Sequence, residues 1–231
     1  MYSVLLISRN DTLNYLPFSI FTKIIMKMKK LLSLLTIAIS IIGCSTASSD
    51  KAPETFSPTS EKGLAIGTIT FEGDGPKNDI YRFFYYPVSD DKKVVRRNKG
   101  KIQILGRIDN KRGHHGDFNN QKSYLFVIER DPGTYAFTEY NYLTRGGHTG
   151  MVNGSKKFSI PFEIKKGEIA YIGELTYVEN AEPGSPRIII ADNMARDLTE
   201  IKKKFPNIPW NLTLNKTVKT GNTGGGIIDF R

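Results

Sequence analysis

The three histidines are the residues of this chain with the most potential for metal or acid–base chemistry. His114 and His115 lie in the sequence Gly-His-His-Gly-Asp, which ends at Asp117, and His148 lies in Gly-Gly-His-Thr-Gly. If these two loops met at one end of a β-sandwich, three imidazoles and a carboxylate would make a competent zinc or copper site. The alternative is two exposed loops without a ligand, because glycines preorganise a site poorly and no Glu-x-x-His pair is present.

The same histidines are the only conventional bases for a serine or threonine nucleophile. Many hydrolases present that nucleophile on a Gly-x-Ser-x-Gly turn, and the sequence contains no such turn. The histidine loops therefore define one functional hypothesis, a metalloenzyme or hydrolase.

A dense run of positive charge suggests a different chemistry, the binding of anions. Lysine or arginine occupies six of the ten positions from 92 to 101. Such a run can contact anionic lipid headgroups, lipopolysaccharide phosphates or glycan carboxylates. The alternative is a solvated loop between strands, since charge runs commonly only keep a surface soluble. The six candidate ligand-binding residues are Lys92, Lys93, Arg96, Arg97, Lys99 and Lys101.

The single cysteine, Cys44, follows a segment with the layout of an export signal. Three lysines lie between positions 27 and 30, residues 31–42 form an apolar run, and the small Gly43 precedes the cysteine. At a rise of about 1.5 Å per residue this run spans about 18 Å as a helix, whereas a bilayer core is about 30 Å thick. A cleaved secretory signal is therefore favoured over a transmembrane helix.

The first 25 residues do not fit any signal layout, because polar residues and a proline interrupt their apolar positions. A second start is available at Met26 or Met28. We interpret residues 1–25 as an upstream extension that is not translated, and residues 26–43 as the signal peptide.

The four residues Ile41-Ile42-Gly43-Cys44 resemble the lipobox of bacterial lipoproteins. The resemblance implies cleavage before Cys44, diacylation of its sulfur and acylation of the new amino terminus. The covalent lipid on Cys44 would then anchor the protein to a membrane, and no other cofactor is expected. Ser45 stands where an aspartate is the usual retention mark, so the resemblance implies the periplasmic face of the outer membrane in a cell with two membranes.

The composition from Cys44 onward limits the kinds of protein and partner. These 188 residues contain 28 lysines and arginines and 22 aspartates and glutamates, a net charge of +6. This charge suits a surface that faces anionic lipid, glycans or acidic partners, and nucleic acid is not expected as a partner of an exported protein. With Cys44 lipidated, no cysteine remains for a disulfide, so a hydrophobic core must stabilise the single domain.

The domain boundaries follow from composition. Residues 44–60 hold the lipidated cysteine and a Ser-, Thr- and Pro-rich stretch with almost no apolar residue, which predicts a flexible tether. Residues 61–220 form the predicted domain. Residues 221–231 form a glycine-rich tail without a regular element, unless its last apolar residues dock on a sheet.

Alternating apolar residues and turn residues predict strands through most of the domain. The expected fold is mainly β, an antiparallel β-sandwich. Strand 80–88 carries aromatic residues on both faces, which indicates burial on both sides or an aromatic-lined surface. The expected strands are 64–71, 80–88, 102–108, 124–129, 134–142, 158–164, 169–177 and 187–191.

The strands 158–164 and 169–177 show the clearest alternation, with Phe162 and Ile164 on the core face of the first. Because only Lys165-Lys166-Gly167 and one further residue separate them, they are expected to form a hairpin. Pro161 lacks a backbone donor, which predicts that its strand lies at a sheet edge.

One amphipathic helix is expected near the C-terminus, over about 193–205. Met194, Leu198, Ile201 and Phe205 are spaced as a single apolar stripe. Asp192 or Asn193 can cap its start, and the proline after Phe205 ends it.

Two segments resemble known β-sandwich modules. Glu-Arg-Asp-Pro-Gly-Thr-Tyr at 129–135 looks like a turn of transthyretin-like or carboxypeptidase-regulatory-like domains, and 162–173 looks like the next strand–turn–strand of small bacterial lipoproteins of unknown function. The similarity covers roughly residues 120–205. It implies a fold and transfers no catalytic residue, because these are scaffold motifs.

Two functional hypotheses result. The first is a membrane-anchored envelope lipoprotein without enzymatic activity, which binds an anionic envelope component or an envelope protein, or supports its assembly, in the periplasm. The second is an envelope metalloenzyme or hydrolase that uses His114, His115 and His148.

Overall fold

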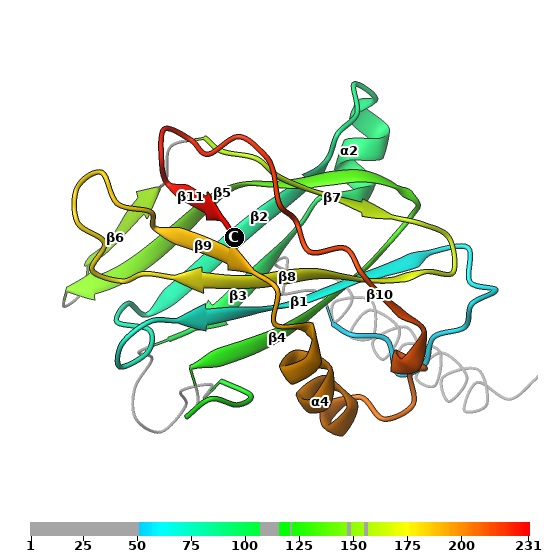
Figure 1. The fold of residues 1–231 in the computed structure, drawn as a ribbon. Coiled ribbons are helices and arrows are strands. Elements are labelled where there is room, and N and C mark those ends of the chain that lie inside the picture. Colours follow the sequence, from blue (N-terminus) through cyan, green and yellow to red (C-terminus); the bar gives the residue numbers. More distant parts are fainter. Residues whose placement is uncertain (1–50, 107–115, 121, 147–148, 155–156) are drawn as a thin grey trace, which may run out of the picture. The chain divides into compact units, whose positions relative to one another are not determined.

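Strands dominate the part of the chain that the structure describes, which is residues 51–106, 116–120, 122–146, 149–154 and 157–231. In this computed structural model they build two sheets packed face to face, with one helix on the outer surface of the first sheet (Figure 1). The prediction of a mainly β fold with a small helical part is confirmed.

The first sheet has the strand order β11-β9-β8-β1-β4, and β10 also pairs with β8. It is a mixed sheet, because β1, β10 and β11 run parallel to their partners β8, β8 and β9. The expectation of a purely antiparallel sandwich is therefore wrong for this sheet. Its strands are β1 (Gly63–Phe71), β4 (Ser123–Arg130), β8 (Ile169–Tyr177), β9 (Ile188–Ala191), β10 (Thr213–Asn215) and β11 (Ile228–Phe230).

The second sheet is antiparallel in all its described pairs, with the order β3-β2-β5-β6, and β7 also pairs with β5. Its strands are β2 (Ile80–Pro87), β3 (Gly100–Leu105), β5 (Gly133–Gly146), β6 (Thr149–Gly154) and β7 (Ile160–Ile164). The described residues also contain three helical elements: α2 (Lys92–Asn98), α4 (Met194–Lys204) and the 3-10 turn η1 (Trp210–Leu212). Helix α4 agrees with the predicted helix to within one residue at each end.

The predicted hairpin of β7 and β8 does not form. β7 pairs with β5 in the second sheet, whereas β8 lies between β1 and β9 in the first. The turn at Lys165–Gly167 therefore carries the chain from one sheet to the other. Both sheets face the same core, so alternation fixes the buried face of each strand and leaves its sheet undetermined. The edge position predicted from Pro161 is confirmed, since β7 pairs with no other described strand.

The core between the sheets is rich in aromatic residues. β2 contributes Tyr81, Phe83 and Tyr85, each at most 1% exposed, and the ring of Tyr177 on β8 lies 5.4 to 6.1 Å from the rings of Tyr81 and Phe83. Phe162 and Ile164, expected on the core face of their strand, are buried here, as is Phe126 of β4. These edge-to-face ring contacts add directional packing to the burial of apolar area.

A second, smaller core lies on the outer face of the first sheet, beneath α4. It contains Ile66, Tyr171, Ile201 and Trp210, all at most 3% exposed. Because both of its faces are covered, β1 is buried at every residue. Leu198, also expected in the core, is only partly buried against this cluster.

The ends of the domain lie beyond the predicted boundaries. Residues 51–60, predicted as part of the tether, lie against the domain, and Phe56 is buried in the second core. The tail docks as well, because Ile228 is buried and β11 pairs with β9. Both segments have the polar or glycine-rich composition that is typical of flexible chain. A few apolar residues in each nevertheless pack against the domain. The described residues all fall within one structural unit, Ala47–Arg231.

Candidate functional site

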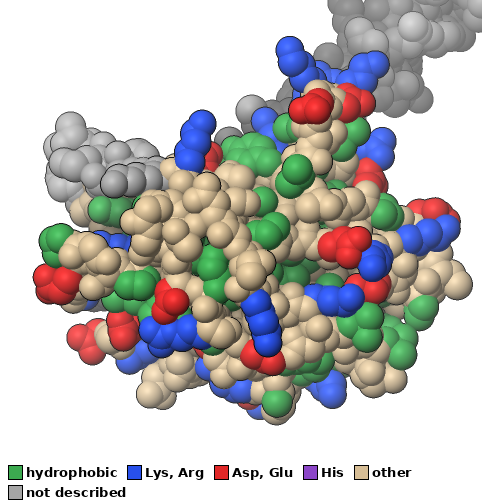
Figure 2. Space-filling model, turned by 45° about the horizontal axis from the view of Figure 1, so that its top comes forward, with side chains coloured by type: hydrophobic (Ala, Val, Ile, Leu, Met, Phe, Trp, Pro, Cys, Tyr) green, Lys and Arg blue, Asp and Glu red, His purple; other side chains and the backbone are tan. Residues whose placement is uncertain are grey.

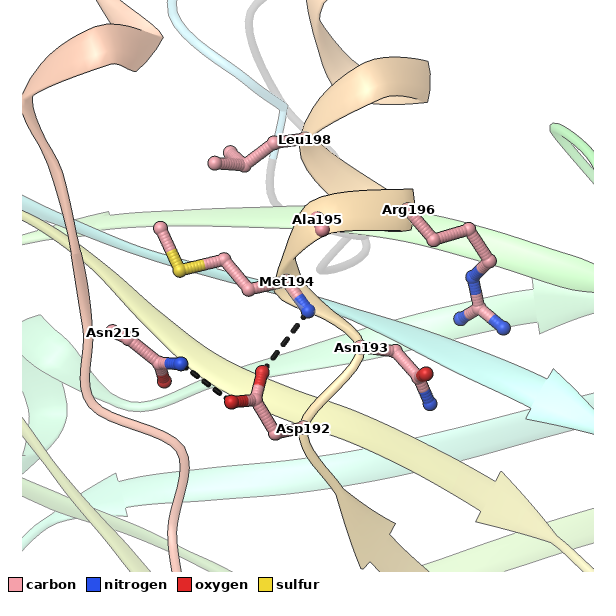
Figure 3. A pocket seen from close by; sticks show the side chains of 7 residues that line it. All are labelled: Asp192, Asn193, Met194, Ala195, Arg196, Leu198 and Asn215. Carbon is pink, nitrogen blue, oxygen red and sulfur yellow. Dashed lines mark hydrogen bonds between the residues drawn. The ribbon is translucent and has the colours of Figure 1, made fainter.

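An open pocket of about 570 Å³ lies on the outer face of the first sheet, where α4 begins (Figure 3). Met194 and Arg196 leave the helix in opposite directions, and Asp192 faces Asn215 across the pocket floor. Asp192 accepts hydrogen bonds from the Met194 backbone N–H at 3.1 Å and from the Asn215 amide at 2.6 Å. The residues that line the pocket are Asp192, Asn193, Met194, Ala195, Arg196, Leu198 and Asn215.

Two carboxylates are buried beside this pocket. Glu174 of β8 is 4% exposed and Asp197 of α4 is 3% exposed. The Arg196 guanidinium joins them, with N–O distances of 2.7 Å to each carboxylate. Its central carbon lies over the Phe118 ring, 5.1 Å from the ring centre. A paired arrangement of this kind is the form in which charges are tolerated in a protein interior.

Hydroxyl and amide groups satisfy the remaining oxygens of these carboxylates. Asp197 Oδ2 accepts hydrogen bonds from the Thr68 hydroxyl and the Tyr171 hydroxyl, both at 2.7 Å. Glu174 accepts hydrogen bonds from the Thr70 hydroxyl and from the Asn193 amide. The network therefore fastens the start of α4 to β1 and β8.

The surroundings of Arg196 and Tyr171 keep both side chains protonated. Burial lowers the pKa of Arg196, but the hydrogen bonds to Glu174 and Asp197 outweigh burial, and the guanidinium pKa is raised. Burial and the adjacent Asp197 carboxylate raise the pKa of Tyr171. Arg196 thus stays charged and Tyr171 stays a neutral donor over the physiological pH range.

A β-bulge places Glu174 on the helix side of the sheet. Ile172 and Leu175 both face the sandwich core, although three positions separate them, because the pairing of β1 with β8 shifts register between Ile66 and Gly67. Ile172 is the extra residue, because Tyr171 pairs with Ile66 and Gly173 pairs with Gly67. Gly173 has a φ of +118°, a conformation in which a side chain is strained. Glu174 is thereby turned outward, toward Thr70 and Arg196.

The contacts of Glu174 and Asp197 indicate that this cluster stabilises the fold. Two nearby carboxylates can serve as general acid and base when one has an unoccupied oxygen near a substrate. Here both carboxylates share one arginine and accept further hydrogen bonds from neighbouring side chains. Ion-pair networks that hold a fold together have this form.

Among the candidate metal ligands, only Asp117 lies in the described part of the chain. One of its oxygens accepts the Leu125 backbone N–H at 2.8 Å, and the other pairs with Lys204 of α4. His114, His115 and His148 lie outside the described residues. Within those residues, no group of three His, Cys, Asp or Glu side chains is arranged to hold a metal.

The basic run does not form the single loop considered from the sequence. Residues 92–98 form helix α2, which Asp91 caps by accepting the Lys93 N–H at 2.7 Å. Lys92, Lys93, Arg96 and Lys99 are exposed, whereas Arg97 pairs with Asp131. On the face drawn in Figure 2, basic and acidic side chains are interspersed.

Arg97 and Lys101 differ from the other members of the basic run in their position or partners. The hydrogen bond from Arg97 lowers the pKa of the Asp131 carboxyl, so this pair is charged at neutral pH. Lys101 belongs to β3 and lies on the outer face of the second sheet. The six residues are therefore distributed over α2, the link that follows it and β3.

Sequence reasoning did not single out Glu174 or Asp197. A signal was present for each: Glu174 is the only charged residue within Ile169–Tyr177, and Asp197 lies three residues after Met194 and four before Ile201, on the packed side of the helix. Threonines at 68 and 70 on an otherwise apolar strand were a further sign of polar partners.

Comparison with known proteins identifies no family for this chain. No protein-family model and no curated protein matches the chain. In the described part of the chain, no helix has the length and apolar character needed to cross a membrane. A leucine-rich repeat protein from Bacteroides thetaiotaomicron aligns over 62% of this chain and 16% of its own, with 8% identity and a TM-score of 0.27, a similarity too low to indicate either fold or function.

Proposed function

We propose that the chain is a bacterial envelope lipoprotein, anchored through Cys44, whose β-sandwich is a binding or assembly-support module without enzymatic activity. The observation that carries the proposal is the sequence from Lys27 to Cys44, with its positive segment, short apolar run and Ile-Ile-Gly-Cys ending. The proposal includes the resemblance to small bacterial lipoproteins with a transthyretin-like sandwich, and a position on the periplasmic face of the outer membrane.

The docked segment 51–60 supports an anchored role by limiting the reach of the domain. Six residues, 45–50, separate Cys44 from the described chain, which begins at Lys51. The seven steps from Cys44 to Lys51 span at most about 25 Å when fully extended, at about 3.5 Å per residue. A lipid on Cys44 would therefore hold the sandwich close to the membrane surface, within reach of headgroups and surface glycans.

A binding role is supported by the internal partners of the acidic side chains. Glu174, Asp197 and Asp117, the carboxylates closest to an enzymatic arrangement, all have partners within the protein. The exposed charges of α2, by contrast, point to solvent, and Lys92, Lys93 and Arg96 can contact anionic material of the envelope.

Replacing Cys44 with serine tests the anchor, since the sulfur is the lipid acceptor. The full chain is expressed in a bacterium with two membranes, and the N-terminal peptide is analysed by mass spectrometry. The wild type should begin at Cys44 and carry acyl mass, whereas Cys44→Ser should remain an uncleaved, unacylated precursor. Ser45→Ala is the matched control and should be processed normally. A mature wild-type chain that begins elsewhere, or that carries no acyl mass, refutes the lipoprotein proposal.

A further inference from the structure

The outer face of the second sheet carries aromatic side chains that the sandwich core does not use. Tyr81, Phe83 and Tyr85 of β2 are in the core, so the alternate residues Phe84 and Tyr86 point the other way. Both are partly exposed and neither belongs to the core clusters. Each side chain is therefore partly accessible to solvent on the outer face of this sheet.

Hydrogen-bonding side chains surround these rings. Arg82 lies across three strands, and its guanidinium donates to the Gln103 carbonyl on β3 at 3.2 Å and to the Asn141 carbonyl on β5 at 3.3 Å. The Tyr86 hydroxyl donates to Glu139 of β5 at 3.2 Å. The face thus combines amide, hydroxyl and carboxylate groups around Phe84, the register partner of Glu139.

The face also holds two cations without a carboxylate partner. Lys101 is opposite Phe84 in the register of β2 and β3, which places it diagonally from Arg82, at about 7 to 8 Å between backbones. Within the described residues, neither Arg82 nor Lys101 forms an ion pair with a carboxylate. Burial, followed by the charge of Arg82, lowers the pKa of Lys101. An anion bound between the two cations would relieve this repulsion.

We propose that this face binds an oligosaccharide that carries carboxylate groups, as uronic acids do. The apolar face of a pyranose ring would stack on Phe84, and its carboxylate would lie between Arg82 and Lys101. Glu139, on the opposite side of Phe84, repels a carboxylate but accepts hydrogen bonds from sugar hydroxyls. The sugar acid is therefore oriented toward β3. This inference rests on the proposed function, because it names the ligand class of the binding module.

A lipid headgroup fits this face less well than a sugar. Lipid surfaces are held by apolar side chains that insert beside the cations. The exposed large hydrophobic residues of the described chain are Val88, Val94, Leu212 and Leu214, and none of them lies within β2, β3 or β5. The amide groups of Gln103 and Asn141, on either side of Arg82, suit the hydroxyls of a sugar.

The test is calorimetric titration of the full chain in detergent with a uronic-acid hexasaccharide. Two comparison ligands separate the sources of affinity: the methyl-esterified hexasaccharide, which lacks the charge, and glycerol phosphate, which lacks the sugar. Wild type should bind the acid form at least tenfold more tightly than either. Lys101→Gln and Phe84→Ser should each weaken binding about tenfold or more, a loss that Lys101→Arg should largely prevent.

Lys219→Gln, which removes one exposed charge from the segment between β10 and β11, is the matched control and should bind as the wild type does. Equal binding of the acid and its ester, tighter binding of glycerol phosphate, or equal losses in Lys219→Gln and Lys101→Gln would each overturn the inference. Processing at Cys44 is measured independently of sugar binding. If the wild-type protein is acylated but does not bind the sugar, only the ligand class is refuted. If the wild-type protein binds the sugar but is not acylated, only the lipoprotein proposal is refuted.

Discussion

Glu174 and Asp197 illustrate how much the role of a residue depends on partners that are distant in sequence. Thr68 lies 129 positions from Asp197, and the two side chains are joined by a 2.7 Å hydrogen bond. Arg196 lies beside Asp197 in the chain and reaches both carboxylates. An acidic pair in a protein interior suggests catalysis at first, and here the partners of each oxygen show that its role is structural.

Replacing Asp197 with alanine should strongly destabilise the domain. The change leaves the hydroxyls of Thr68 and Tyr171 without their acceptor and Arg196 with one carboxylate instead of two. Breaking a buried pair in this way typically costs about 3 to 5 kcal/mol. The free energy of unfolding, from denaturant titration monitored by circular dichroism, gives the measurement.

Glu200→Ala on the same helix is the control for Asp197→Ala. Its partner Lys203 is exposed, and such a pair contributes about 0.5 kcal/mol or less. Similar losses in the two variants would show that the Asp197 network does not hold α4 to the sheet.

At the scale of elements, β7 and β8 show the limits of periodicity. Each strand has the predicted bounds to within two residues, and β7 has the predicted buried face. The apolar residues of β8, expected on one face, are divided by the bulge: Ile169 and Tyr171 lie in the second core, and Leu175 and Tyr177 lie between the sheets. Their pairing differs from the prediction, because β7 joins β5 and β8 joins β1. A short loop between two alternating strands favours a hairpin, but the same loop can also cross from one sheet of a sandwich to the other.

The face assignment of β7 can be tested with two adjacent residues. Phe162 is 5% exposed and packs against Tyr135 and Phe137, whereas Glu163 is exposed. Phe162→Ala should lower the free energy of unfolding by about 3 to 5 kcal/mol, and Glu163→Ala by less than about 0.5 kcal/mol. Denaturant titration of both variants measures the difference. Equal effects would contradict the burial of this face.

At the scale of the whole molecule, the buried tyrosines couple stability to alkaline pH. Burial raises the pKa of Tyr124 and of Tyr135 to about 12, and it also raises the pKa values of Tyr81, Tyr171 and Tyr177. An unfolded chain releases these protons near the ordinary tyrosine pKa of about 10. The folded protein therefore retains protons that the unfolded chain loses above that pH.

The free energy of unfolding should consequently fall as pH rises above about 10, and it should vary little with tyrosine ionisation below that pH. Denaturant titrations at several pH values between about 9 and 11 measure this slope, and tyrosinate absorbance follows ionisation in parallel. Stability that stays constant while the tyrosinate signal rises would contradict burial of these rings.

The sequence by itself determined the properties that depend on local order. The alternation of β2 and β7, the stripe of α4 and the edge position of Pro161 all follow from residues close together in the chain. The lysines and the apolar run ahead of Cys44, and the basic run, were visible for the same reason. These features need only the pleat, the helical period and the hydrogen bonds that proline cannot form.

Only the tertiary structure decided which strands pair and which polar groups meet. The Gly173 bulge turns Glu174 away from the core, and no periodicity predicts a bulge. The placement of Arg82 and Lys101 on one face depends on the register of β2 with β3. The docking of Phe56 depends on the second core beneath α4. Each of these results from contacts between distant segments, because long-range packing selects among arrangements that local preferences leave nearly equal in energy.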